Sequence, residues 1–261
     1  MPKIWTIIDK EWAEVFKNRL VLFTVLFMPI LFTALPLLMI AIGGSQAGMG
    51  DATDMPDQYL EMCGDLTGTA CFTLMMVNQF LLLFMMMPLI IPVTIAAYSI
   101  VGEKTTHCLE PLLATPITTA ELLIGKSLAA LIPGVLATWL SFGVFTVISY
   151  ILVQSPELLQ RILDPMWIIA VGLVGPLLAL AGINVTLMVS SRVSDPRTAE
   201  QVSMVLLLPL LGLFFAQIAG VLMVNVQVMQ LAAVIMVAVD VGLVYLGVRA
   251  FQRETILTKW K

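Results

Sequence analysis

Long runs of apolar residues, separated by short polar segments, dominate the chain. Uncharged stretches cover residues 20–50, 66–102, 127–156, 165–191 and 201–239. Apolar sequence then continues beyond Asp240 to Val248. A helix that crosses the ~30 Å hydrocarbon core of a bilayer needs about 20 mostly apolar residues, because it rises ~1.5 Å per residue. The last stretch is too long for one such helix, and the polar segment 225–227 divides it into two.

The pattern therefore predicts an all-α integral membrane protein with six membrane-spanning helices. We expect the spans at about residues 20–42, 76–101, 127–153, 166–190, 202–223 and 228–249. Together they make one transmembrane domain over residues 20–250, followed by a tail at residues 251–261. Pro, Gly, Asp, Asn and Gln gather between the spans, as is typical of turns and loops.

Residues 1–19 predict a helix that lies on the membrane surface instead of crossing it. Apolar residues recur there at helical spacing, namely Ile4, Ile7, Ile8, Trp12, Val15 and Phe16. This amphipathic pattern, with two Trp residues and a basic end, is typical of an interfacial helix. A helix packed against another cytoplasmic protein is the alternative.

The composition of the chain is typical of a membrane protein, and the positions of its basic residues predict which side of the membrane each loop faces. Hydrophobic residues make up 60% of the chain and charged residues 11%, against roughly a quarter charged in soluble domains. Cytoplasmic loops carry the excess of Lys and Arg. With the N-terminus inside, only Arg161 of the 13 basic residues lies outside. We therefore expect a multi-pass protein of the cell (inner) membrane, with both termini cytoplasmic, in contact with lipid and not with nucleic acid.

Two cysteines lie in the predicted external loop, which extends from about residue 43 to 75. Cys63 and Cys71 are eight positions apart, and an oxidising compartment would allow a disulfide between them. The alternative is a pair of free thiols, because Cys71 lies near the membrane edge and buried free cysteine is common. Cys108 falls on the cytoplasmic side, where we expect it to be reduced.

The predicted cytoplasmic loop between the second and third spans, residues 102–126, has a helical pattern of its own. Leu109, Leu112 and Leu113 share one helical face, and Pro116 ends that helix. A threonine after the proline can cap a second short helix. Two short helices against the membrane would offer a surface to a cytoplasmic partner.

This loop strongly resembles that of the membrane permeases of type 2 ABC transporters. The residues that match are Glu103, Lys104, Leu109, Glu110, Leu112, Leu113, Thr115, Pro116, Gly125 and Lys126. Further segments that look like this family are Lys10–Glu11, Pro29, Ser194–Arg197, Glu200–Gln201 and Pro209. One departure is His107–Cys108, where the family has Gly-Thr, and His107 is either a modified contact or a tolerated polar residue.

The resemblance implies the membrane subunit of an ATP-driven exporter. Two permease subunits, identical or different, would face each other, and each would rest on a cytoplasmic ABC ATPase that binds ATP and Mg²⁺. The implied ATPase-coupling loop contains Glu103, Lys104, Leu109, Glu110, Leu112, Leu113, Thr115 and Pro116. The implied secondary ATPase contacts are Lys10, Glu11, Asp195 and Arg197. This chain itself would bind no cofactor and would not be an enzyme.

No motif in the chain indicates catalysis or a metal site. Residues 120–127 read A-E-L-L-I-G-K-S, one position short of the phosphate-binding pattern, because Ala120 stands where the first Gly belongs. A membrane span also follows it, instead of a soluble strand–loop–helix unit. The chain has one His and no Cys/His cluster with zinc spacing, and its many methionines are ordinary filler of apolar helices.

Asp240 lies inside the predicted sixth span, where an acidic residue is energetically expensive and is a functional candidate. The alternative is a carboxyl group that is hydrogen-bonded within the bundle, to Asn184 or Gln217. The competing function is accordingly a stand-alone secondary transporter or channel that uses Asp240 for ion coupling. A membrane enzyme or scaffold would need paired catalytic groups, which the sequence lacks. Pro88 and Pro92 predict a kink in the second span.

Overall fold

The computed structural model describes residues 2–43, 63, 69–105, 119–153, 155–190, 192–222 and 224–250. Helices account for nearly all of these residues, and this part of the chain contains no strand. The helices are α1 (Pro2–Val15), α2 (Arg19–Gly43), α4 (Thr69–Phe84), α5 (Met87–Thr105), α7 (Thr119–Leu152), α8 (Pro156–Ile162), α9 (Pro165–Ile169), α10 (Gly175–Ser190), α11 (Pro196–Ser203), α12 (Leu207–Ile218) and α13 (Val226–Ala250). A π-helical turn, η2 (Ala170–Val174), and a 3-10 turn, η3 (Met204–Leu206), lie between them.

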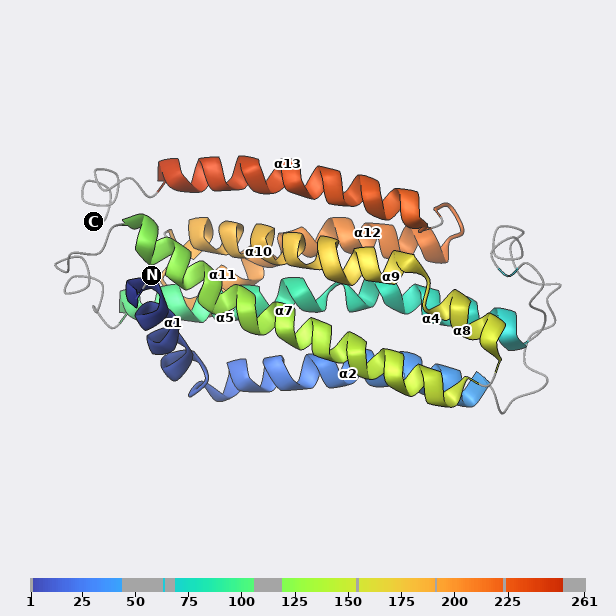
Figure 1. Ribbon diagram of the computed structural model, residues 1–261. Helices are drawn as coiled ribbons and strands as arrows, with labels where there is room; N and C mark the ends of the chain where they lie inside the picture. Colours follow the sequence, from blue (N-terminus) through green and yellow to red (C-terminus); the bar gives the residue numbers. More distant parts are fainter. Residues whose placement is uncertain are drawn as a thin grey trace.

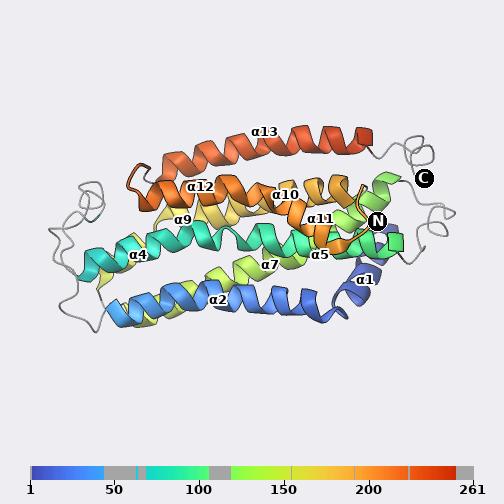
Figure 2. The ribbon, with the colours of Figure 1, turned by 180° about the vertical axis from the view of Figure 1, so that it is seen from behind.

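Within the described residues, six helical segments are long and apolar enough to cross a membrane. They are Val21–Ile42, Ala70–Ser99, Glu121–Leu152, Pro156–Ser190, Pro196–Ile218 and Val226–Gly247. The predicted all-α architecture with six spans is therefore confirmed. The segments form one elongated bundle, and α1 lies at the same end of it as the last turn of α13 (Figures 1 and 2).

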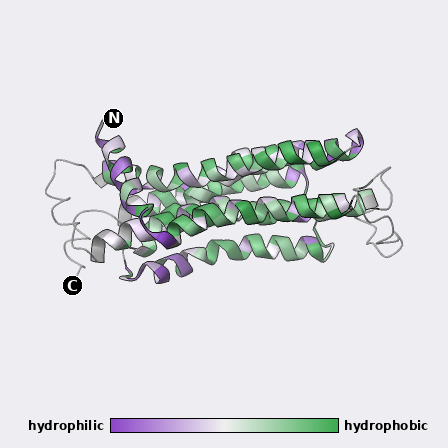
Figure 3. Cartoon of the chain, turned by 90° about the horizontal axis from the view of Figure 1, so that it is seen from below, coloured by the Kyte–Doolittle hydropathy of each residue, from purple (hydrophilic) through white to green (hydrophobic). Residues whose placement is uncertain are grey.

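The surface of the bundle is apolar along most of its length. Figure 3 shows hydrophobic residues through the middle of the helices and hydrophilic ones gathered in α1 and near the helix ends. Large apolar side chains such as Phe23, Ile30 and Leu231 are exposed around the bundle. So much exposed apolar surface is foreign to a soluble monomer and suits helices that face lipid.

The second span is broken in its middle, between α4 and α5. Pro88 has no N–H and cannot donate to the carbonyl of Phe84, so the α-helical ladder is interrupted there. Instead, the N–H groups of Leu89 and Ile90 donate to the carbonyl of Met86 at 3.2 and 2.9 Å. The predicted kink thus lies at Pro88, whereas Pro92 is contained within α5.

The fourth span contains the π-helical turn η2, and the proline that comes after it, Pro176, explains why the turn forms. The N–H of Gly175 donates to the carbonyl of Ala170, and Pro176 has no N–H to offer the carbonyl of Val171. The indole Nε1 of Trp139 on α7 supplies the missing donor at 3.1 Å. A side chain of the third span thereby completes the backbone hydrogen bonding of the fourth.

An aromatic cluster and a central helix make up the core. The ring centroid of Trp167 lies 6.0 Å from Phe84, 5.9 Å from Phe142 and 5.1 Å from Phe145. Helix α5 is surrounded by neighbours, since it packs against α1, α2, α7, α10 and α11. Most side chains along residues 87–101 of α5, the helix that leads into the predicted coupling loop, are buried.

Cys63 and Cys71 form a disulfide with Cα atoms 5.2 Å apart. Both residues are buried. Cys71 belongs to the first turns of α4, at the end of the bundle opposite α1 (Figure 1). The disulfide and the N-terminal helix therefore lie at opposite ends of the molecule.

Candidate functional site

The predicted coupling loop joins the end of α5 to the beginning of α7. Glu103 and Lys104 are part of the last turn of α5, which ends at Thr105, and α7 begins at Thr119. The other predicted coupling residues lie outside the described residues, namely Leu109, Glu110, Leu112, Leu113, Thr115 and Pro116. The structure thus describes the two helices that hold the loop, and how other helices are attached to them.

A buried ion pair attaches α1 to α7. Nζ of Lys126 lies 2.7 Å from Oε1 of Glu11, and the two side chains are 5% and 2% exposed. Burying a charge is costly unless it has a partner, and removing one member of a buried pair leaves the other uncompensated. The pair therefore holds the N-terminal helix on the first turns of the third span.

Ser99 of α5 completes a three-helix hydrogen-bonded triangle with this pair. The hydroxyl of Ser99 donates to Oε2 of Glu11, and Nζ of Lys126 donates to Oγ of Ser99 at 3.1 Å. We call Glu11, Ser99 and Lys126 the polar triangle. It joins α1, the helix that enters the predicted coupling loop and the helix that leaves it.

Close packing supports the polar triangle on the same face of α1. The indole Nε1 of Trp12 donates to the carbonyl of Ala129 at 2.9 Å. Gly125 lies so near Ile7 that an added Cβ would be 2.9 Å from Ile7 Cγ2. Only the absence of a side chain at position 125 allows α1 to approach α7 this closely.

A second polar connection reaches α5 from α11. The hydroxyl of Thr94 donates to Oε1 of Glu200 at 2.6 Å. Helix α5 thus presents one hydroxyl to a carboxylate on α1 and another to a carboxylate on α11. Both connections lie between the break at Pro88 and the end of α5.

The loop before α11 has a local role that its sequence explains. Asp195 caps α11, since its Oδ2 accepts hydrogen bonds from the N–H and the hydroxyl of Thr198, both at 2.9 Å. The bond from the Thr198 N–H is the main reason why the pKa of Asp195 is lowered from its ordinary value, and nearby Arg197 acts in the same direction. Asp195 and Arg197 line a polar groove together with Asn18 and Tyr98.

The four predicted secondary ATPase contacts divide into two kinds. Lys10, Asp195 and Arg197 have accessible side chains, and Lys10 pairs with Glu14 at 3.9 Å on the outer side of α1. Glu11 is turned inward to the polar triangle. The geometry therefore favours a role for Glu11 inside this chain, whereas contact with a partner stays a prediction for the other three.

The predicted hydrogen bond of Asp240 is wrong. Its side chain is buried, at 7% exposure, but neither carboxylate oxygen has a hydrogen-bond partner among the described residues, so neither Asn184 nor Gln217 is bonded to it. Gln217 is unsuitable because it lies at the end of α12, whereas Asp240 is 14 residues into α13, or roughly 20 Å along that helix. Among the described residues, no group of His, Cys, Asp or Glu is arranged to hold a metal.

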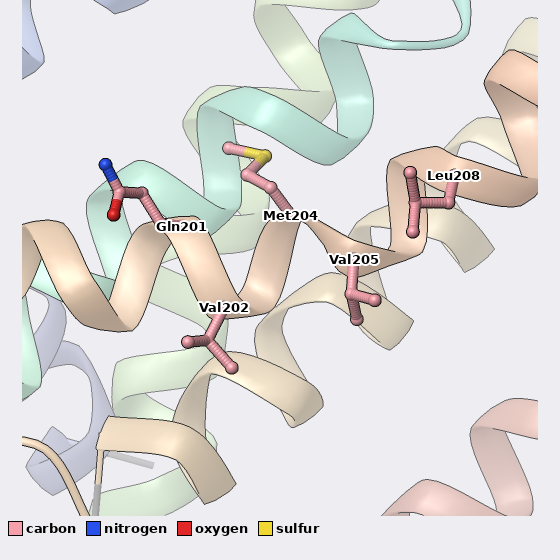
Figure 4. A pocket seen from close by; sticks show the side chains of 5 residues that line it. All are labelled: Gln201, Val202, Met204, Val205 and Leu208. Carbon is pink, nitrogen blue, oxygen red and sulfur yellow. The ribbon is translucent and has the colours of Figure 1, made fainter.

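An open apolar groove extends along the outside of α11, η3 and α12. Its lining residues are Gln201, Val202, Met204, Val205 and Leu208 (Figure 4). Val202, Val205 and Leu208 are exposed. The groove contains no charged group and is a lipid-facing or partner-facing surface, not an enclosed binding cavity.

The comparison with protein families agrees with this architecture. The family model described as "ABC-2 family transporter protein" matches residues 5–243. The chain belongs to the ABC-2 transporter family. The resemblance inferred from its motifs is confirmed.

A curated protein of Pseudomonas aeruginosa, "Probable ABC transporter permease protein NosY", is similar to this ABC-2 protein. The two are 32% identical over 143 residues, which are 55% of this chain and 44% of the relative. The match thus spans less than half the length of that protein.

Family motifs of this ABC-2 protein supply both polar connections. Glu11, Glu200 and the adjacent pair Gly125–Lys126 come from three matching segments of the sequence. In the structure, Glu11 and Glu200 bind α5, and Gly125 and Lys126 contact α1. Sequence reasoning missed this pairing. A signal was present, because Glu11 falls on the apolar stripe of α1 between Ile7 and Val15, where a charge needs a buried partner.

Proposed function

We propose that this ABC-2 protein is the permease subunit of an ATP-driven exporter. It forms the translocation pathway as a dimer, with an identical or a different second permease. A separate cytoplasmic ABC ATPase binds ATP and Mg²⁺ and drives the movement, so this chain hydrolyses no ATP by itself. The observation that carries the proposal is that the polar triangle attaches α5 and α7 to α1. These two helices flank the predicted coupling loop, and we call them its arms.

The attachment matters because a loop can transmit force only if its ends are fixed to rigid elements. Helices transmit movement as rigid bodies when their packing and hydrogen bonds leave no room for independent sliding. Helix α5 is held by Glu11 and Glu200, and α7 by Glu11 through Lys126. A push on residues 106–118 would therefore move α1, α5 and α7 together.

Two features at opposite ends of the bundle support the proposed orientation. Basic residues gather in and just after α1 and at the C-terminal end of α13. Both lie at the same end of the bundle, and their charge favours the cytoplasm for this end. The Cys63–Cys71 disulfide belongs to the other end, and disulfides persist in oxidising compartments outside the cytoplasm. Both features fit a protein of the inner membrane with cytoplasmic termini and a cytoplasmic coupling loop.

The cargo is proposed only as a chemical class. Apolar spans with few fixed charges suit a lipid-like or amphipathic molecule better than a small ion. The open groove of Val202, Val205 and Leu208 on α11, η3 and α12 adds apolar surface that a second permease or lipid would cover.

A second candidate function rests on Asp240. A buried intramembrane carboxylate without a hydrogen-bond partner in the described part of the chain is a candidate ion-coupling group. This function is a stand-alone secondary transporter or channel, and it predicts solute movement that depends on an ion gradient and needs no ATPase.

Reconstitution with an ATPase distinguishes the two functions. The chain is co-expressed with a candidate ABC ATPase, and co-purification and ATP turnover are compared for the wild type and a Glu110→Arg/Leu113→Asp variant. The matched control carries the same changes in the predicted external loop, Leu60→Asp/Glu61→Arg. Loss of binding or turnover in the first variant alone supports the permease. A wild type that ignores every ATPase and moves solute along an ion gradient contradicts it.

A further inference from the structure

We propose that Glu11 and Lys126 are positioning residues that couple ATP hydrolysis to movement of the bundle. The inference rests on the proposed function and deepens it. The buried pair lets α1 hold the two arms of the coupling loop, α5 and α7, in a fixed position relative to each other. The pair is required for the ATPase to work productively on the bundle and not for the ATPase to bind.

The position of the pair is the first argument. Ser99 lies six residues before the end of α5 at Thr105, and Lys126 lies seven residues after the beginning of α7 at Thr119. At a rise of ~1.5 Å per residue, the polar triangle is about 10 Å from either end of the predicted coupling loop. Movement of the loop therefore reaches the triangle before it reaches the rest of the bundle.

The chemistry of the contact is the second argument. Apolar side chains could hold α1 against α7 without the desolvation that a buried ion pair requires. The best-attested use of such a pair is to select one register between helices, because it is satisfied in only one geometry. Here Oε1 of Glu11 binds Lys126 while Oε2 accepts from Ser99, so both carboxylate oxygens are committed to different helices.

The packing around the triangle is the third argument. A shift of α1 along α7 would break the bond from Trp12 to the Ala129 carbonyl and drive Ile7 against a neighbour of Gly125. The contact on the other side of α5, between Thr94 and Glu200, contains no cation. Among the polar connections described above, the one to α1 is therefore the ionic one, and it involves both α5 and α7.

Charge reversal tests the proposal in the assembled transporter. Glu11→Lys, Lys126→Glu and the double swap are compared with the wild type, each purified with the ATPase and reconstituted in lipid. Asp9→Lys is the matched control, because it reverses an exposed charge on the same helix. The two readouts are the amount of ATPase bound per permease and the ATP turnover per bound ATPase.

The expected result separates coupling from binding. Each single reversal is expected to lower ATP turnover per bound ATPase about tenfold, since it places two like charges in a buried site. The amount of bound ATPase stays within about twofold of the wild type, and the double swap restores most of the turnover. Asp9→Lys behaves as the wild type.

Three outcomes would overturn the inference. The first is ATP turnover that is unchanged in the single reversals. The second is turnover that falls only in proportion to the amount of bound ATPase. The third is a double swap that folds but does not restore turnover. If the reversals do not fold, the neutral double variant Glu11→Gln/Lys126→Met replaces them and is expected to bind the ATPase with the same loss of turnover. A wild type that binds no ATPase contradicts the proposed function itself, and the inference falls with it.

Discussion

Gly134 of α7 lies directly on the ring of Pro92 in α5. A Cβ at position 134 would be 2.3 Å from Pro92 Cγ and 2.7 Å from Cδ. On a neighbouring face of α5, a Cβ at Gly182 of α10 would be 2.6 Å from Leu89 Cδ1 and 2.8 Å from Val93 Cγ2. Glycines on two neighbouring helices thus bring α7 and α10 close to α5, as small residues do at helix contacts in membranes.

Gly134→Ala is expected to destabilise the protein. The proline ring is rigid, so the new methyl group must push the helices apart, and overpacking of this kind costs about 1–3 kcal/mol. Thermal unfolding in detergent measures the effect. Gly143→Ala on the same helix is the control, because nothing lies within 4 Å of a Cβ there. Equal stability of the two variants would contradict the close contact.

Trp139→Phe is expected to destabilise the fourth span. The change keeps an aromatic ring but removes the indole N–H that donates to the Val171 carbonyl in place of Pro176. An orphaned buried carbonyl costs about 1–3 kcal/mol. Tyr150→Phe, on the exposed side of α7, is the control in the same unfolding assay. If both variants unfold at the wild-type temperature, the hydrogen bond contributes nothing to stability.

Asp240→Leu is expected to stabilise the fold. Leucine has a similar branched shape, and it removes two buried oxygens that have no hydrogen-bond partner among the described residues. Removing such groups is neutral or stabilising, by up to about 1–3 kcal/mol. ATP-driven transport is measured on the same samples. A more stable variant with normal transport supports the permease, whereas a stable variant that has lost transport identifies Asp240 as a functional acid.

The Cys63–Cys71 disulfide is expected to stabilise the protein and to report its orientation. The chain-entropy model gives about 2–3 kcal/mol for a loop closed by cysteines with a sequence separation of 8. Cys63→Ser/Cys71→Ser should lower the unfolding temperature accordingly.

The same disulfide tests the topology in intact cells. Both thiols should react with a membrane-impermeant reagent only after reduction from outside. Cys108→Ser keeps the signal specific to this pair. Labelling without prior reduction would show that the cysteines are free, and labelling only after lysis would reverse the predicted orientation.

The spans and a kink in the second of them could be predicted because they depend on neighbouring residues alone. Run length decides whether a helix can cross a bilayer. A proline removes one bond of the helical ladder, but Pro92 stays inside α5, so the sequence predicts a kink in this span without saying which proline causes it. The disulfide was an open alternative, because spacing allows a pair of cysteines to bond without requiring it.

The polar triangle could not be predicted, because nothing in the sequence says which helices are neighbours. Glu11 and Lys126 were recognised as motif residues, but their contact joins segments 115 positions apart. Ser99 and Thr94 are ordinary hydroxyl residues in an apolar span until a carboxylate is placed beside each of them. The suggested partners for Asp240 fail for the same reason, because residue type does not give the depth of Gln217 in the bundle.

The bond from Trp139 to the Val171 carbonyl also bears on how the protein is made. During insertion, a fourth span alone in hydrocarbon would expose a carbonyl that its own helix cannot satisfy, a costly state in a medium without water. The third span carries the donor and precedes it by only a short connection, residues 153–155. The two spans are therefore expected to leave the translocation machinery together, as a preassembled helical hairpin.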